Sequence, residues 1–109
     1  MCILKRVDVL NVSSFIMFKI KKKEVIEMEL KDTIELMNSN DYKERFKAEY
    51  LQIKIRYEKL HKMTVKYEAG TLNFEPSCSL EILKEQKSYM GNYLRMLEIR
   101  AEIEKIDLD

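Results

Sequence analysis

Two side chains near residue 40 have types and spacing suited to holding an anion. Tyr42 and Arg45 lie one helical turn apart and follow Asp41, where the surrounding pattern predicts the start of a helix. The free N–H groups and the dipole at a helix start favour negative charge. An aromatic ring beside a guanidinium can also hold a flat, charged ligand. Two plainer interpretations stay open: Tyr42 is a hydrophobic staple, and Arg45 forms a surface ion pair with Glu49.

Residues that could perform catalysis are scarce. The single histidine, His61, has no metal-binding neighbours, and Cys2 and Cys78 lie far apart, so we expect neither a zinc site nor a disulfide framework. Cys78 lies near a predicted helix start but has no base beside it in the sequence. The chain is therefore predicted not to be an enzyme and to need no metal and no cofactor.

Composition favours a small helical protein. The 109 residues make one domain at most, and 46% of them are hydrophobic and 36% charged. Two glycines and one proline are too few for the turns of a β-sandwich or barrel, and the apolar content is too high for a disordered linker. The formal charge of +1 gives no reason to expect DNA binding, and no segment is apolar enough for a membrane span. We expect a cytoplasmic protein.

Hydrophobic spacing predicts two long helices. The first covers residues 42–68 and ends before Gly70, and the second covers residues 80–105 and begins after a Ser79 cap. The linker 71–79 between them makes an antiparallel hairpin, and a short helix is predicted over residues 28–38. The fold class is therefore all-α. The predicted packing stripes are Phe46, Tyr50, Ile53, Tyr57, Leu60, Thr64 and Tyr67 on the first helix, and Leu83, Gln86 or Lys87, Met90, Tyr93, Leu94, Leu97, Ala101 and Glu104 on the second.

A single hairpin cannot cover all of its apolar side chains. Several of them lie beside the narrow line of contact between the two helices and are predicted to be contacts in a helical oligomer: Tyr50, Met63, Tyr89, Met96 and Ile99. Gln86 and Arg100 lie on the stripe and are expected to belong to a buried network that sets the register. The last six residues, 104–109, are expected to form a solvated end.

The first 27 residues differ from the rest of the chain. They carry six basic and three acidic residues, so the 82 residues from Met28 onward carry a net −2. Lys23-Glu24-Val25 can be encoded by a bacterial ribosome-binding sequence at a suitable distance before the Met28 codon. We therefore expect residues 1–27 to be an extension outside the natural product, and residues 28–109 to be a single helical-hairpin domain. An edge strand or a flexible arm is the alternative.

Two segments carry a resemblance to a known family. The first begins Asp41-Tyr42-Lys43-Glu44-Arg45-Phe46 and continues to Leu60, and the second is Leu83-x-x-Gln86-x-x-x-Met90-x-x-Tyr93-x-x-x-Leu97-x-x-Arg100. Together they resemble the hairpin domain of the phage anti-CBASS and anti-Thoeris cyclic-nucleotide sponges. Small proteins of crAss-like phages and prophages have the same hairpin type.

The resemblance implies a binding function. Sponges of this kind assemble into homo-oligomers, often hexamers, and act in the host bacterial cytoplasm during infection. They sequester cyclic di- or trinucleotides or cyclic ADP-ribose isomers between protomers, without degrading them. The tyrosine of the family's pocket corresponds to Tyr42. Its phosphate-binding basic residue corresponds to Arg56 or Lys59, and the side chain would reach the ligand that a neighbouring chain binds. Surface ion pairs with Glu58 are the plainer interpretation of these two cations. The alternative function is a hairpin module that binds a protein, such as a phage inhibitor of a host protein.

Overall fold

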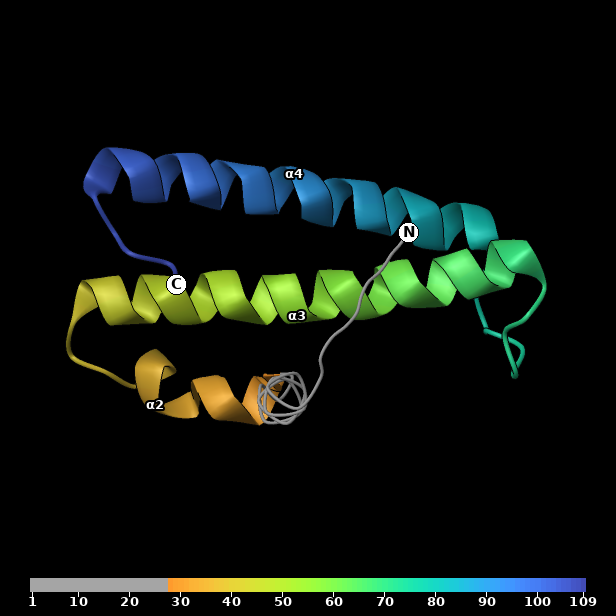
Figure 1. The fold of residues 1–109 in the computed structure, drawn as a ribbon, viewed down its shortest axis with the longest axis horizontal. Helices are drawn as coiled ribbons and strands as arrows, with labels where there is room; N and C mark the ends of the chain where they lie inside the picture. Colours follow the sequence, from red (N-terminus) through yellow and green to blue (C-terminus); the bar gives the residue numbers. More distant parts are fainter. Residues whose placement is uncertain (1–27) are drawn as a thin grey trace, which may run out of the picture.

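The chain folds into a helical hairpin with a short helix along one side. The computed structural model describes residues 28–109. Helices α3 (Tyr42–Ala69) and α4 (Leu80–Glu104) run antiparallel, and α3 lies between α4 and α2 (Ile34–Met37) (Figure 1). The predicted all-α hairpin with a short N-terminal helix is confirmed. The extension expected over residues 1–27 lies outside the described residues.

Local capping signals set the helix ends at the predicted positions. The Asp41 side chain accepts a hydrogen bond from the Lys43 backbone N–H at 3.0 Å, which caps α3. Gly70 ends α3 with a φ of 79°, a left-handed conformation that costs glycine little. The Ser79 side chain accepts from the Ile82 N–H at 3.3 Å and caps α4. The sharp reversal therefore falls between residues 70 and 79, as the sequence predicts.

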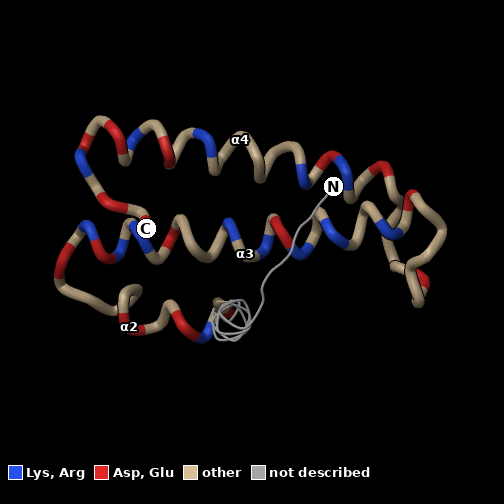
Figure 2. The backbone as a smooth tube through the Cα atoms, viewed as in Figure 1, with Lys and Arg blue, Asp and Glu red and all other residues tan. Residues whose placement is uncertain are grey.

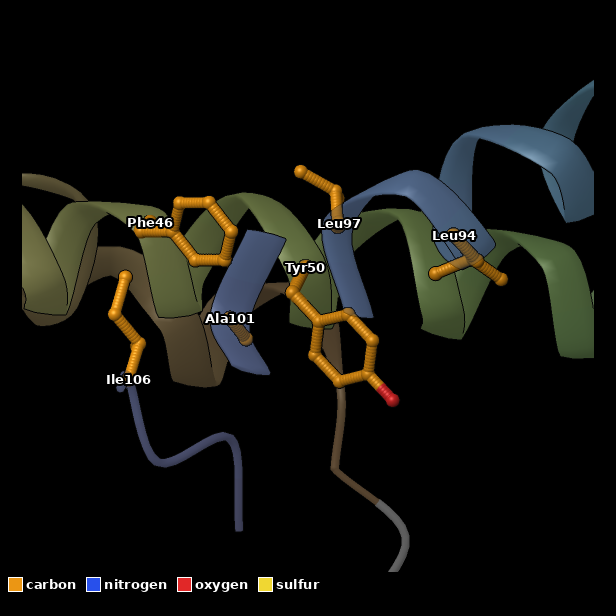
Figure 3. Packing of buried hydrophobic residues seen from close by; sticks show 6 residues of the cluster. All are labelled: Phe46, Tyr50, Leu94, Leu97, Ala101 and Ile106. Carbon is orange, nitrogen blue, oxygen red and sulfur yellow. The ribbon is translucent and has the colours of Figure 1, made fainter. Parts of the chain in front are cut away.

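The hydrophobic core lies where α3 begins and α4 ends. Leu97 and Phe46 are 2% and 3% exposed, and they pack with residues from both helices and the C-terminal tail (Figure 3). The full cluster of buried side chains is Phe46, Tyr50, Leu94, Leu97, Ala101 and Ile106. Tyr50 is therefore part of the core of the single chain, and its prediction as an oligomer contact is wrong.

The C-terminal tail folds back onto α3. Lys105 adopts a left-handed conformation with φ 57°, which turns the chain after α4. Ile106 then places its side chain in the core with 7% exposure, and Lys47 Nζ donates to the Asp109 carbonyl at 2.8 Å. The prediction of a solvated end over residues 104–109 is wrong for Ile106, whose apolar side chain is buried in the core, while Lys105, Asp107 and Asp109 are exposed.

A polar contact anchors the short N-terminal segment. A 3₁₀ turn, η1 (Leu30–Thr33), leads directly into α2 (Ile34–Met37). Thr33 is fully buried, and its hydroxyl accepts from Gln52 Nε2 of α3 at 2.9 Å. The apolar spacing that predicts this helix consists of Leu30, Ile34 and Met37; Leu30 is half-buried, and Ile34 and Met37 are each nearly half exposed. Gln52 Nε2 also donates to Met37 Sδ at 3.4 Å, so Gln52 holds this segment at two points.

Both helices carry basic and acidic residues (Figure 2). The stretch 54–66 of α3 is mainly basic, with five Lys or Arg residues and one Glu. None of the helices between residues 28 and 109 is both long enough and apolar enough to cross a membrane.

Candidate functional site

The four predicted site residues fall into two groups on α3. Tyr42 and Arg45 lie in its first turn, and Arg56 and Lys59 lie near its middle. Tyr42 and Arg56 are 14 positions apart, which is about 21 Å along a helix. The structure thus brings Arg56 and Lys59 together and leaves Tyr42 and Arg45 at a separate place on the same chain.

A groove between α3 and α4 holds the Arg56 and Lys59 pair. It has a volume of about 400 Å³, and its walls include Leu60 of α3 and Gln86 and Met90 of α4. Apolar side chains form most of its lining, including Leu30 of the N-terminal segment, and Arg56 and Lys59 are its two cationic groups. Lys59 also borders a second hollow of about 330 Å³ beside the N-terminal segment. The groove is within the size range of small-molecule sites.

Both cations of the groove are unpaired within the described part of the chain. Residues 28–109 provide neither Arg56 nor Lys59 with a hydrogen bond or an ion pair. The predicted pairs with Glu58 do not form, because Glu58 lies 3.9 Å from Lys54 instead. The two positive groups are therefore available to an anionic ligand at a groove lined mostly by apolar side chains.

Tyr42 lies in a cluster that joins the two helices, which we call the Tyr42 cluster: Tyr42, Phe46, Arg100 and Glu104. The Tyr42 hydroxyl donates to Glu104 Oε1 at 2.9 Å and accepts from the Arg100 guanidinium. Arg100 Nε also donates to Glu104 Oε2 at 3.1 Å, and its guanidinium carbon lies 4.8 Å from the centre of the Phe46 ring. The Tyr42 ring meets Phe46 edge-on at 6.2 Å between centroids. Tyr42 thus connects the two helices through polar contacts that a simple hydrophobic staple lacks.

Hydrogen bonding perturbs the titration of the Tyr42 cluster. The bond from Tyr42 is the largest cause that lowers the pKa of Glu104, and the same bond raises the pKa of the Tyr42 hydroxyl. The Glu104 carboxylate in turn raises the pKa of Arg100. At neutral pH the cluster therefore contains a neutral phenol, a guanidinium cation and a carboxylate anion. A guanidinium that already holds a carboxylate oxygen has the chemistry needed to hold a phosphate oxygen.

Arg45 points back toward the segment that precedes α3. Its guanidinium donates to the Ser39 carbonyl at 2.8 Å, and the Asp41 N–H donates to the Ser39 hydroxyl at 2.9 Å. No ion pair joins Arg45 to Glu49 within residues 28–109, because Glu49 accepts a hydrogen bond from the Tyr93 hydroxyl of α4. In the folded chain Arg45 therefore supports the entry into α3.

Arg100 and Glu104 are the members of this region that the sequence did not identify as site residues. The sequence predicted Arg100 and Gln86 in a buried network; both are exposed, so the predicted burial is wrong, although Arg100 does join a network between the helices. The physical reason is that α3 covers only the face of α4 that carries Leu94 and Leu97, and long polar side chains extend past its edge into solvent. The spacing of four between Arg100 and Glu104, typical of a surface ion pair, was the signal that could have indicated that Arg100 is exposed.

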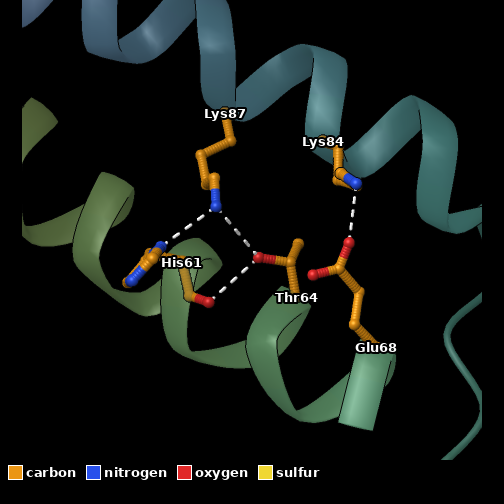
Figure 4. A network of polar contacts seen from close by, with 5 residues as sticks. All are labelled: His61, Thr64, Glu68, Lys84 and Lys87. Carbon is orange, nitrogen blue, oxygen red and sulfur yellow. Dashed lines mark hydrogen bonds and ion pairs between the residues drawn. The ribbon is translucent and has the colours of Figure 1, made fainter.

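A polar network holds the other end of the hairpin, close to the linker. Lys87 Nζ lies 3.0 Å from His61 Nδ1 and 3.4 Å from the Thr64 hydroxyl, and Lys84 pairs with Glu68 at 2.6 Å (Figure 4). His61 therefore has a structural contact. Within residues 28–109, no group of three or more His, Cys, Asp or Glu side chains is placed to hold a metal ion.

The sequence comparisons identify a family. Residues 40–103, more than half of the chain, match the family model described as Sequestin. A comparison with curated proteins and a comparison with solved structures each find no match. The matched range covers α3, the linker and α4 up to the residue before Glu104. The family's name implies that its members sequester a binding partner. From this match over the whole hairpin, the chain belongs to the Sequestin family.

Proposed function

We propose that this protein is a phage anti-defence sponge that binds cyclic nucleotide immune signals and withholds them from the host effector without degrading them. The ligand class is a cyclic di- or trinucleotide or a cyclic ADP-ribose isomer, bound in the host bacterial cytoplasm. Membership of the Sequestin family supports the sequestering part of the proposal. The resemblance of the two helical segments to anti-CBASS and anti-Thoeris sponges supports the choice of ligand.

The observation that carries the proposal is the unpaired pair of cations on an apolar groove. A cyclic nucleotide presents flat bases and anionic phosphates in one rigid molecule. Leu60 and Met90 give a base an apolar surface, while Arg56 and Lys59 can each form charge-assisted bonds with phosphate oxygens. Neither cation has an ion pair within residues 28–109, so at the groove itself ligand binding replaces water contacts only.

Tyr42 takes part through a neighbouring chain in this proposal. It lies about 21 Å from Arg56 along α3, too far for one compact ligand to reach both residues in the same chain. A homo-oligomer, such as the hexamer that the resemblance implies, would bring Tyr42 of one chain near the groove of the next. There the ligand's phosphate would replace the Glu104 carboxylate on Arg100, and the Tyr42 ring would stack on a base.

Calorimetric titration of the full chain tests the proposal, after a thermal-shift screen has selected the cyclic nucleotide that binds most tightly. We expect Arg56→Ala and Lys59→Ala each to weaken binding by about 10- to 100-fold, because each removes a charge-assisted phosphate contact. Tyr42→Ala should weaken binding by a similar factor through the loss of stacking. The matched control is Arg95→Ala, which removes an exposed cation of α4 that does not line the groove.

Two outcomes would contradict the proposal at different levels. If all three variants bind as tightly as the wild type, the site assignment is wrong although the function stands. If no cyclic nucleotide binds the wild type more tightly than about 10 μM, which corresponds to about −7 kcal/mol, the sponge function itself is wrong. The hairpin would then fit the alternative of a module that binds a host protein.

A further inference from the structure

The N-terminal segment, residues 28–38, forms one wall of the groove between α3 and α4. Leu30, in η1, lines that groove. Met28 and Glu29, the two residues before it, line the second hollow of about 330 Å³. Lys59 of α3 borders both spaces. The position of the segment on α3 therefore determines the shape of both hollows.

Little apolar burial holds this segment against α3, although α2 lies along that helix (Figure 1). Thr33 is the one buried residue of the segment. The core cluster contains no side chain from residues 28–38. A helix of only four residues, such as α2, is not stable by itself. The segment must therefore depend on its polar contacts with α3.

A continuous chain of hydrogen bonds, which we call the Thr33 bridge, provides these contacts. Gln52 Nε2 of α3 donates to the Thr33 hydroxyl at 2.9 Å, and that hydroxyl donates to the Leu30 carbonyl at 2.8 Å. The buried hydroxyl is thus acceptor and donor at once, and its loss would leave two polar groups without a partner. The bridge joins α3 to the residue that lines the groove, whereas Gln52 and Thr33 line neither hollow.

We propose that Gln52 and Thr33 are positioning residues for the ligand groove, because the Thr33 bridge holds the N-terminal segment on α3 and so fixes Leu30 as a wall. When the bridge is broken, the segment should leave α3 while the hairpin stays folded, since the core cluster lies elsewhere. A ligand that fills the groove contacts the wall and stabilises the closed segment. This effect of the ligand rests on the proposed function, whereas the bridge itself does not.

Hydrogen exchange of the full chain without nucleotide tests the bridge. Thr33→Val keeps the shape of the side chain and removes the hydroxyl, so the amides of residues 28–38 should exchange about 10-fold faster or more, while residues 42–104 exchange as in the wild type. Thr33→Ser keeps the hydroxyl and should exchange more slowly than Thr33→Val. The matched control, Thr64→Val, makes the same change at a buried position near the linker and should leave the segment unchanged. An unprotected segment in the wild type, faster exchange of the whole chain in Thr33→Val, or equal exchange in both Thr33 variants would overturn the proposal.

Thiol labelling tests whether the segment covers the groove. Ile55 is 8% exposed and borders both hollows, whereas Leu83 of α4 is 9% exposed and borders neither. Each is replaced separately by cysteine in a chain whose own cysteines, Cys2 and Cys78, are replaced by serine. Adding Thr33→Val should speed the labelling of residue 55 by about 10-fold and leave residue 83 unchanged. Equal labelling of residue 55 with and without Thr33→Val would contradict the wall.

Nucleotide binding tests the contact between the ligand and the wall. The cyclic nucleotide selected by thermal shift, at a free concentration of about ten times Kd, should slow exchange over residues 28–38 of the wild type by about 10-fold. Thr33→Val should bind it about 10-fold more weakly, and Thr64→Val should bind it like the wild type. Unchanged exchange of the segment at saturation would contradict the contact. If no nucleotide binds, the proposed function fails, and the two measurements without nucleotide still decide whether the bridge holds the wall.

Discussion

The two ends of the hairpin are held together by different forces. At the end where α3 begins and α4 ends, the buried cluster around Phe46 and Leu97 forms the hydrophobic core, and the Tyr42 cluster covers its edge (Figure 3). At the linker end, a buried threonine, Thr64, and the exposed pair Lys84–Glu68 make polar contacts between the helices (Figure 4). Burial of apolar area contributes more stability than exposed ion pairs do. The core end should therefore provide most of the free energy of folding, and the linker end should mainly fix the path of the chain.

The groove with the two unpaired cations lies between these ends. Arg56 and Lys59 belong neither to the hydrophobic core nor to the network near the linker. Substitutions at these two positions should consequently change binding without unfolding the hairpin. This separation makes it possible to test stability and binding with different sets of variants.

The largest effect on stability is expected at the core end. Leu97→Ala should lower the free energy of unfolding by about 2–5 kcal/mol, because Leu97 is 2% exposed and packs against core side chains from both helices. Leu83→Ala, near the linker, should lie at the low end of that range because Leu83 is buried outside the main cluster. Denaturant unfolding followed by circular dichroism measures both variants. If Leu83→Ala lowered the free energy of unfolding more than Leu97→Ala does, the linker end and not the core end would provide most of the stability.

Substituting the two glycines is expected to change the free energy of unfolding by a smaller amount. Gly70→Ala should cost about 1–2 kcal/mol, because a φ of 79° strains any residue that has a Cβ. Gly91→Ala in the interior of α4 should instead gain about 0.5–1 kcal/mol of helix propensity, since its Cβ would meet the Tyr57 ring at an ordinary 3.4 Å. Thermal unfolding of both variants measures the difference. Equal changes of the same sign would show that the left-handed conformation at residue 70 is not required.

The smallest predicted effect is on the stability of the fold at acidic pH. The pKa of Glu104 is lowered below its ordinary value of 4.5, chiefly by the hydrogen bond from Tyr42. Its contribution to stability is therefore complete above pH 4.5 and is lost as the pH falls through the lower pKa of the folded chain. Glu104→Gln should flatten the decline of stability below pH 4.5, whereas Glu102→Gln on the exposed side of α4 should leave it unchanged. Unfolding midpoints measured from pH 6 down to pH 3 test this; an identical decline in all three proteins would contradict it.

The sequence predicts the local features of this fold better than the contacts between its elements. The caps at Asp41, Gly70 and Ser79 act within a few residues, so the helix boundaries could be predicted closely. The burial of Ile106 could not, because it depends on a left-handed turn at Lys105 and on space between two helices. Hydrophobic periodicity says which face of a helix is apolar, but it does not say where the covered surface ends.

The same difference between local features and contacts between elements applies to the candidate site. Arg56 and Lys59 each lie one position before a stripe residue, Tyr57 and Leu60, and they share a groove because α4 packs beside this part of α3. The engagement of Tyr42 by Arg100 and Glu104 joins residues about 60 positions apart in the chain. Such a contact depends on the register of the two helices, which the sequence pattern alone does not determine.

The most direct measurement of the central claim follows the fate of the bound nucleotide. The full chain is incubated with the cyclic nucleotide selected by thermal shift, separated from unbound ligand by gel filtration, denatured by heat, and the released material is identified by mass spectrometry. Sequestration predicts that nucleotide travels with the protein, is protected from phosphodiesterase while bound, and is recovered unchanged after denaturation. Recovery of a linear or hydrolysed product would identify the protein as an enzyme, and protein that carries no nucleotide would contradict the sponge function.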